Sequence, residues 1–173
     1  MRENVVLTIT GPDRVGLVEE VTGRLLGLGC NVEASHMARL GGEFAMLMLV
    51  SIPAEQAEDL RVANDRLAAE GFQVTMTMTT PPGVVPATSA FQVTVEGADH
   101  EGIVHDIAAG LALHGINIET MDTFVTPAAV SGVPLFTMIA TVTAPAGLAE
   151  SSWTDALHDA AAEANVSVTV SRA

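Results

Sequence analysis

An internal duplication constrains this chain more than any other feature. Residues 11–18, GPDRVGLV, recur 86 positions later as GADHEGIV over residues 97–104. The flanking segments align at the same spacing: 5–9 with 91–95, and 29–33 with 115–119. Because glycine, aspartate and asparagine positions stay in phase across both halves, we expect two related units in tandem.

The length allows one domain of ordinary size or two small units, and the duplication favours two. The 173 residues leave roughly 80 for each unit, which is marginal for a separate core. We predict a first domain over residues 1–80, a linker over 81–89 and a second domain over 90–173. The linker is rich in proline and poor in core-forming residues. Units of this size gain stability by packing on each other or on a second chain.

The formal net charge of −14 argues against a nucleic-acid-binding function. All seven basic residues are arginine, and there is no lysine. A protein that grips phosphates needs a basic face, so the composition argues against direct binding of nucleic acid. The acidity either keeps the protein soluble or forms an acidic face that meets a basic partner.

The sequence predicts a cytoplasmic protein with no membrane association. The first residues show no signal-peptide pattern and lead directly into an alternating strand pattern. Apolar runs are too short to span a bilayer. The single cysteine, Cys30, rules out an intramolecular disulfide and fits a reducing compartment.

Apolar periodicity predicts the order βαββαβ in each unit. In the first unit we expect strands over 5–10, 31–40, 43–52 and 72–79, with helices ending near 28 and spanning 53–70. In the second we expect strands over 90–96, 116–125, from 136 and over 166–171, helices over 102–114 and 151–164, and a hairpin loop over 126–133. Gly11-Pro12 is expected to stop the first strand, and the Asp13 carboxylate to cap the first helix.

This order predicts an α+β fold with two ferredoxin-like βαββαβ units. Right-handed crossovers place both helices of a unit on one face of an antiparallel four-stranded sheet. Residues 44–50 are apolar at nearly every position, which indicates a strand buried on both faces. We therefore expect the second sheet face to be covered by the sister unit or by another chain, and a homo-oligomer to form.

Both motif copies resemble the ACT domain family. The first copy carries Asp13, Gly16, Gly29 and Asn31, and the second carries Asp99, Gly102, Gly115 and Asn117. A tandem pair with no attached enzyme is similar to the glycine cleavage system transcriptional repressor family. The resemblance implies a regulatory sensor that binds an amino acid or similar small metabolite at an interface between two ACT-like units. It also implies signalling through a protein partner, a regulator or an enzyme, rather than through DNA contact.

The resemblance also implies the binding residues. Carried over position by position, these are Asp13, Arg14, Gly16, Asn31, Asp99, Gly102 and Asn117. Free N–H groups at a helix start favour a carboxylate, and glycine permits its close approach. Asparagine offers a donor and an acceptor to an amino acid. Arg14 favours the first copy, because Asp99 and Glu101 would repel an anion in the second. In the alternative interpretation, these residues serve only as helix cap, turn and strand start.

Catalytic and metal chemistry find no support in the motifs. The five histidines show no metal-ligand spacing, and no nucleophile motif or cofactor-binding loop is present. We therefore expect a non-catalytic protein without metal or cofactor. Met46, Met48, Met76 and Met78 fall on strand positions and are predicted to lie in the core, with a methionine-rich partner surface as the alternative. Trp153 is predicted to be a packing or interface anchor. A ligand-free interaction module and a small enzyme on a ferredoxin-like scaffold remain as alternative functions.

Overall fold

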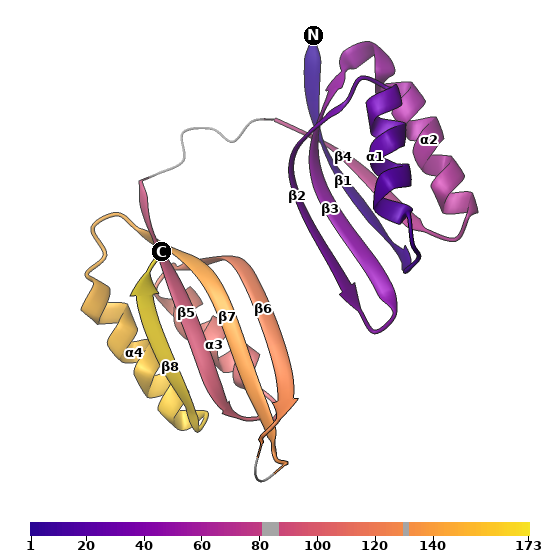
Figure 1. Ribbon diagram of the computed structural model, residues 1–173. Helices are drawn as coiled ribbons and strands as arrows, with labels where there is room; N and C mark the ends of the chain where they lie inside the picture. The colour runs from indigo at the N-terminus through magenta and orange to yellow at the C-terminus, as the bar shows by residue number, and fades with distance from the viewer. Residues whose placement is uncertain (81–86, 130–131) are drawn as a thin grey trace. The chain divides into compact units, whose positions relative to one another are not determined.

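The computed structural model describes residues 1–80, 87–129 and 132–173. The chain divides into two compact units, Met1–Gly83 and Val84–Ala173. Each unit has the order βαββαβ and a four-stranded antiparallel sheet (Figure 1). The predicted fold class, two ferredoxin-like units, is confirmed.

The first unit contains four strands and two α-helices. Its elements are β1 (Arg2–Pro12), α1 (Leu17–Gly27), β2 (Asn31–Leu40), β3 (Glu43–Pro53), the 3-10 turn η1 (Ala54–Gln56), α2 (Ala57–Ala69) and β4 (Gln73–Thr79). The strand order is β2-β3-β1-β4, which leaves β2 and β4 at the edges. Both helices lie on one face of the sheet (Figure 1).

The second unit repeats this arrangement. Its elements are β5 (Thr88–Ala98), α3 (Ile103–Leu113), β6 (Asn117–Pro127), β7 (Pro134–Pro145), α4 (Glu150–Glu163) and β8 (Val166–Arg172). The strand order is β6-β7-β5-β8, and again both helices cover the same face (Figure 1).

Each unit has its own core between its helices and its sheet. Val5, Leu7 and Ile9 of β1 alternate inward against Leu17 and Leu25 of α1. These alternations follow from the strand period of two and the helical spacing of three and four. The core of the second unit includes Trp153, which is only 1% exposed and packs edge-on against Phe91 with ring centroids 5.2 Å apart. Trp153 is therefore a packing residue of the unit.

The methionine prediction is confirmed for the central strand and wrong for one edge position. Met46 and Met48 on β3 are buried, and Met76 on β4 is partly buried against the same core. Met78 is 48% exposed, because it lies near the end of the edge strand β4.

Gly11 and Pro12 do not stop β1, contrary to the expectation. They remain paired with Phe44 and Glu43 of β3. Gly11 is needed for close packing, because a Cβ atom there would lie 2.5 Å from the ring of Phe72. Its counterpart Gly97 lies equally close to the next strand, where a Cβ atom would be 2.6 Å from Val166.

Several boundaries in the second unit differ from the sequence prediction. The strand β5 begins at Thr88 and ends at Ala98, because antiparallel pairing with β7 continues from Pro145 to Leu135. Residues 88–89 of the expected linker thus belong to a strand, and residues 81–86 of it lie outside the described residues. The start of the expected hairpin loop, Thr126-Pro127, belongs to β6, and residues 130–131 lie outside the described part.

Candidate ligand-binding site

The predicted site residues lie at two ends of each sheet. The loop after β1, with Asp13, Arg14 and Gly16, lies where Pro12 pairs with Glu43. At the other end, Asn31 and Asn4 both pair with Ser51. Ser51 is eight residues further along β3 than Glu43, or roughly 26 Å at the usual rise of a strand. One unit therefore does not bring its loop and its asparagine together, and the same holds for the second unit.

The loop carries an uncapped helix start. Gly16 is the residue before α1 and adopts the left-handed conformation, with φ of 88°. Gly102 does the same before α3, with φ of 100°. Within the described chain, no side-chain hydrogen bond caps either helix. No side chain therefore takes the first-turn N–H groups of either helix, although the Leu17 N–H donates to the Arg14 carbonyl at 3.4 Å within the same loop.

Asp13 is not the helix cap that the sequence predicted. Its carboxylate Oδ2 lies 2.9 Å from Nε of Arg39 on β2, and its backbone N–H donates to the Gly42 carbonyl at 3.1 Å. Asp13 therefore holds the loop to the β2–β3 hairpin, which explains why its side chain turns away from α1. Asp99 keeps only the backbone part of this link, donating to the Pro134 carbonyl at 3.0 Å.

Arg14 is engaged by carboxylates of its own unit. Its guanidinium contacts Glu20 at 2.5 Å and Glu70 at 3.6 Å, and stacks over the ring of Phe72 at 5.7 Å. The hydrogen bond from Arg14 holds the pKa of Glu20 below its usual value. Arg24 joins the same two carboxylates. Arg14 therefore ties the loop to the C-terminal end of α2, and its charge is largely compensated.

His100 occupies the position of Arg14 in the second unit and makes an equivalent tie. Its Nε2 lies 2.7 Å from the carbonyl oxygen of Ala164, which caps α4 as Glu70 caps α2. Its Nδ1 lies 3.0 Å from the Glu101 carbonyl oxygen. Hydrogen bonds to the Glu101 and Ala164 carbonyls raise the pKa of His100, because both ring nitrogens donate only in the imidazolium form.

The start of β2 holds a polar cluster that is repeated in β6. Asn31 donates from Nδ2 to Oε1 of Glu33 at 2.9 Å, and Asn117 donates likewise to Glu119 at 2.7 Å. Thr143 adds a hydroxyl donor to Glu119 at 2.9 Å. In each unit the hydrogen bond from the asparagine does most to lower the pKa of the glutamate. A hydroxyl on the neighbouring strand, from Ser51 or Thr143, lowers that pKa further.

Glu33 and Glu119 are site candidates that the sequence reasoning missed. Both fall at a β-bulge, between Val32 and Ala34 in one unit and between Ile118 and Thr120 in the other. The extra residue of a bulge redirects its side chain relative to the regular alternation. The signal was present in the sequence as Gly-x-Asn-x-Glu in both copies, but it does not reveal the bulge.

The first unit adds a cation to this cluster. Arg2 donates from Nε to the Ser51 hydroxyl at 3.1 Å, and from its terminal nitrogen to the carbonyl oxygens of Ser51 and Gly29 at 2.7 and 3.1 Å. The second unit has Thr88 at the position of Arg2. The two strand starts therefore share the Asn–Glu pair and differ in charge.

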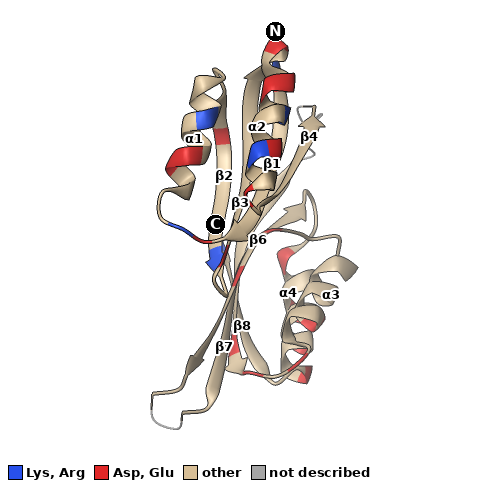
Figure 2. Ribbon diagram, turned by 90° about the vertical axis from the view of Figure 1, so that its right-hand side faces the viewer, with Lys and Arg blue, Asp and Glu red and all other residues tan. Residues whose placement is uncertain are grey.

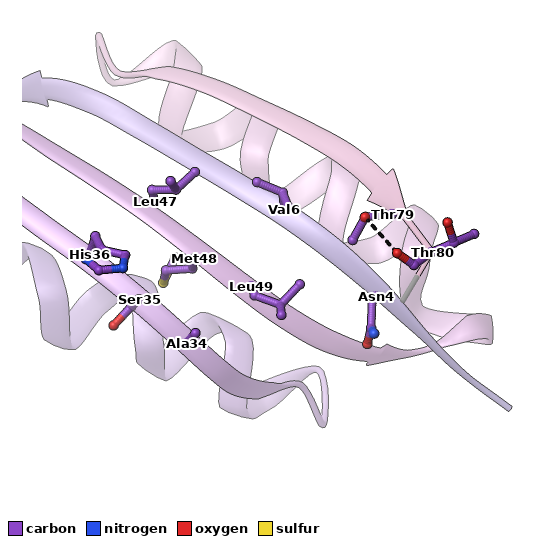
Figure 3. A pocket seen from close by; sticks show the side chains of 10 residues that line it. All are labelled: Asn4, Val6, Ala34, Ser35, His36, Leu47, Met48, Leu49, Thr79 and Thr80. Atoms are coloured by element: carbon purple, nitrogen blue, oxygen red, sulfur yellow. Dashed lines mark hydrogen bonds between the residues drawn. The ribbon is translucent and has the colours of Figure 1, made fainter. Parts of the chain in front are cut away.

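A shallow depression lies beside this cluster, on the sheet face away from the helices. Val6, Leu47 and Leu49 form its apolar floor, and Asn4 and Thr79 lie at one end (Figure 3). Its volume is about 250 Å³. The sequence did not predict this depression, because its lining residues come from four strands that align only in the folded sheet.

The described part of the chain offers neither a metal site nor a membrane-spanning helix. No group of three or more His, Cys, Asp or Glu residues is placed to hold a metal ion there. Among the same residues, no helix is long and apolar enough to cross a membrane.

Comparison with known proteins identifies the first unit. Residues 3–79 match the family model of the ACT domain. The chain is 29% identical over 128 residues to the glycine cleavage system transcriptional repressors of Escherichia coli (strain K12) and Shigella flexneri. The match covers 72% of this chain and 66% of each relative, just under two thirds of the relatives' length.

Solved structures match the whole chain. An unknown protein from Galdieria sulphuraria is 35% identical, with a TM-score of 0.88 over 100% of this chain and 99% of the other. A protein provisionally named glycine cleavage system transcriptional repressor matches at 20% identity and a TM-score of 0.70, over 99% of this chain and 97% of the other. Residues 3–79 therefore match the ACT domain, the second unit repeats the same fold and motif, and the chain as a whole resembles the glycine cleavage system transcriptional repressor family.

Proposed function

We propose that this tandem ACT-domain protein is a non-catalytic, cytoplasmic regulator that binds an amino acid or a similar small metabolite where two ACT units meet. Bound ligand changes how the protein engages a protein partner. The observation that carries the proposal is that two features occur in both units: a helix start without a side-chain cap, and an Asn–Glu cluster. These two features suit the two charged ends of an amino acid.

The separation of the two features explains why two units are needed. The loop and the Asn–Glu cluster lie at opposite ends of one sheet, as the register shows. The edge strand β2 is exposed along its whole length. Antiparallel pairing of two such edges sets the start of one strand beside the end of the other. It brings the Asn–Glu cluster of one unit near the loop of the next.

In this arrangement each group has a defined role. The helix-start N–H groups and Gly16 receive the ligand carboxylate, because the positive end of the helix dipole favours an anion. Glu33, kept ionised by Asn31, receives the ligand ammonium. Arg14 and Asp13 shape the loop through their contacts with Glu70 and Arg39 rather than through contact with the ligand.

The charge distribution supports a protein partner rather than nucleic acid. The second unit contains ten Asp and Glu residues and a single arginine, Arg172. Figure 2 shows acidic residues and no basic ones along α3 and α4. Such a surface repels phosphates and attracts a basic protein face.

A thermal-stability screen against the common amino acids tests the proposal. A ligand at about a hundred times its dissociation constant adds roughly 2.7 kcal/mol to the unfolding free energy, a shift of a few degrees in Tm. We expect one or two amino acids to raise Tm, and Glu33→Gln to lose that shift. Glu119→Gln is the matched control that shows whether the second unit takes part. A screen in which no amino acid shifts Tm would instead favour the ligand-free interaction module.

A further inference from the structure

The open face of the first sheet carries an apolar patch. We define this patch as Val6, Ala34, Ala45, Leu47 and Leu49, which share the face away from the helices. Leu47, near its centre, is 46% exposed. An exposed cluster of this kind on a sheet face costs free energy unless another surface covers it.

The duplicated unit does not keep the patch. Val6 pairs with Leu49 in the first sheet, and the corresponding pair in the second sheet is Gln92 and Thr141. Ala34 beside Leu49 corresponds to Thr120 beside Thr141. The same fold is therefore stable with a polar face, so the apolar residues of the first unit are not required by the fold itself.

The open faces of the two sheets also differ in charge. The described residues that line the depression over this patch include no Asp, Glu, Lys or Arg. On the second sheet, Asp122 stands beside Ile139 where His36 stands beside Leu47, and Glu96 lies on the same face. In a chain of net charge −14, the patch itself is free of carboxylates, and Glu43 on the same face lies beyond Ala45 at the hairpin end of β3.

The absence of charge in the patch indicates what kind of surface covers it. In a contact related by a two-fold axis, each copy presents the same patch to the other. A face with carboxylates would then set like charges against each other, which disfavours association. A basic partner gains nothing from a patch without acidic groups, whereas a second copy of this chain buries apolar area on both sides without placing carboxylates of the patch against each other.

We propose that two copies of this chain pack against each other through the apolar patch of the first unit, sheet face to sheet face. Sheets packed in this way lie about 10 Å apart, and their inward side chains interdigitate. Val6, Leu47 and Leu49 of each copy fill that layer. The proposal does not depend on amino-acid binding, since its central residues, Val6, Leu47 and Leu49, lie on the inner strands β1 and β3 rather than in the loop or the Asn–Glu cluster.

Sedimentation of the purified full-length protein without added amino acid tests this inference. The monomer mass is 17.9 kDa, and we expect wild type to form a dimer or a multiple of it. Leu47→Glu should halve the assembly mass and raise the dissociation constant at least about a hundredfold, as expected when a central contact is replaced by a buried charge. Ile139→Glu, at the equivalent position of the second unit, is the matched control and should leave the mass unchanged.

A second variant distinguishes loss of the contact from misfolding of the protein. Val6→Gln with Leu49→Thr installs the residues that the second unit already accommodates at these positions, so it should fold and should also halve the mass. A wild type that sediments as a monomer at every concentration would overturn the inference. So would Leu47→Glu and Ile139→Glu acting alike, or a folded Val6→Gln, Leu49→Thr variant with the wild-type mass.

Discussion

Arg14 and His100 occupy the same position in the two units, and both connect the loop after the first strand to the end of the unit's second helix. The two contacts differ in chemistry. Arg14 links the loop of the first unit to the C-terminal end of α2 with a permanent charge. His100 links the loop of the second unit to the end of α4 through Nε2, and it keeps this bond together with the Nδ1 bond to Glu101 only when both ring nitrogens carry a proton. The first tie is independent of pH near neutrality, and the second is not.

The His100 tie predicts a pH dependence of stability. Its hydrogen bonds raise the folded-state pKa above the unfolded value of about 6.5. The stabilising contribution is therefore fully present below about pH 6.5 and is lost as pH rises through the folded pKa. Denaturant unfolding at several pH values should show this loss for wild type and not for His100→Gln. His158→Gln is the control on α4; if it removes the dependence as well, the assignment to His100 is wrong.

A side chain at Gly97 is expected to clash with the neighbouring strand, because Gly97 on β5 pairs with Val166 on β8. A Cβ atom there would lie 2.6 Å from Cγ1 and 3.1 Å from Cα of Val166. Because part of the obstacle is backbone, Gly97→Ala should lower the unfolding free energy by about 1–3 kcal/mol. Gly23→Ala is the matched control, since its nearest neighbour atom would be 3.8 Å away, and it should raise stability by up to about 1 kcal/mol. Denaturant titration compares the two.

At the scale of elements, the sequence predicted the helices and strands well. It did not predict the contacts that the residues at their ends make. Periodicity and glycine positions located the eight strands and four α-helices that the described residues form. The role of Asp13 could not be predicted, because its partner Arg39 comes from a hairpin that approaches only after folding. The glutamates at the two bulges were missed for a similar reason: a bulge depends on pairing with the next strand.

The ion pair between Asp13 and Arg39 is expected to contribute little to the unfolding free energy. Arg39 is 69% exposed and the Asp13 carboxylate 31%, so the ion pair is well screened. Asp13→Asn should lower the unfolding free energy by no more than about 1 kcal/mol. Denaturant unfolding measures this, with Asp99→Asn as the control that has Val125 in place of Arg39. A loss of several kcal/mol would show that Asp13 does more than tie the hairpin.

At the scale of the whole molecule, the duplication and the charge were readable from the sequence, while the difference between the two sheet faces was not. The apolar run over 44–50 suggested a covered face, but only the register shows that Leu47 and Leu49 align with Val6 and Ala34 into a patch. The two units thus share one fold and differ in surface, which lets one chain present two kinds of contact.

The net charge of −14 predicts a response to salt. Repulsion among the excess carboxylates destabilises the compact state, and salt screens it. The ion pairs of the described residues all involve partly exposed side chains and contribute little each. Raising the concentration of NaCl should therefore raise Tm in a thermal melt. A fall in Tm would mean that ion pairs outweigh repulsion.

Calorimetric titration measures ligand binding at the Asn–Glu cluster most directly. The amino acid that most raises Tm should bind wild type saturably, and Asn31→Ala should weaken that binding at least about tenfold, which is about 1.4 kcal/mol, while leaving the fold intact. Equal affinity of Asn31→Ala and wild type would place the ligand elsewhere. Absence of binding heat for every amino acid would contradict the proposed sensor.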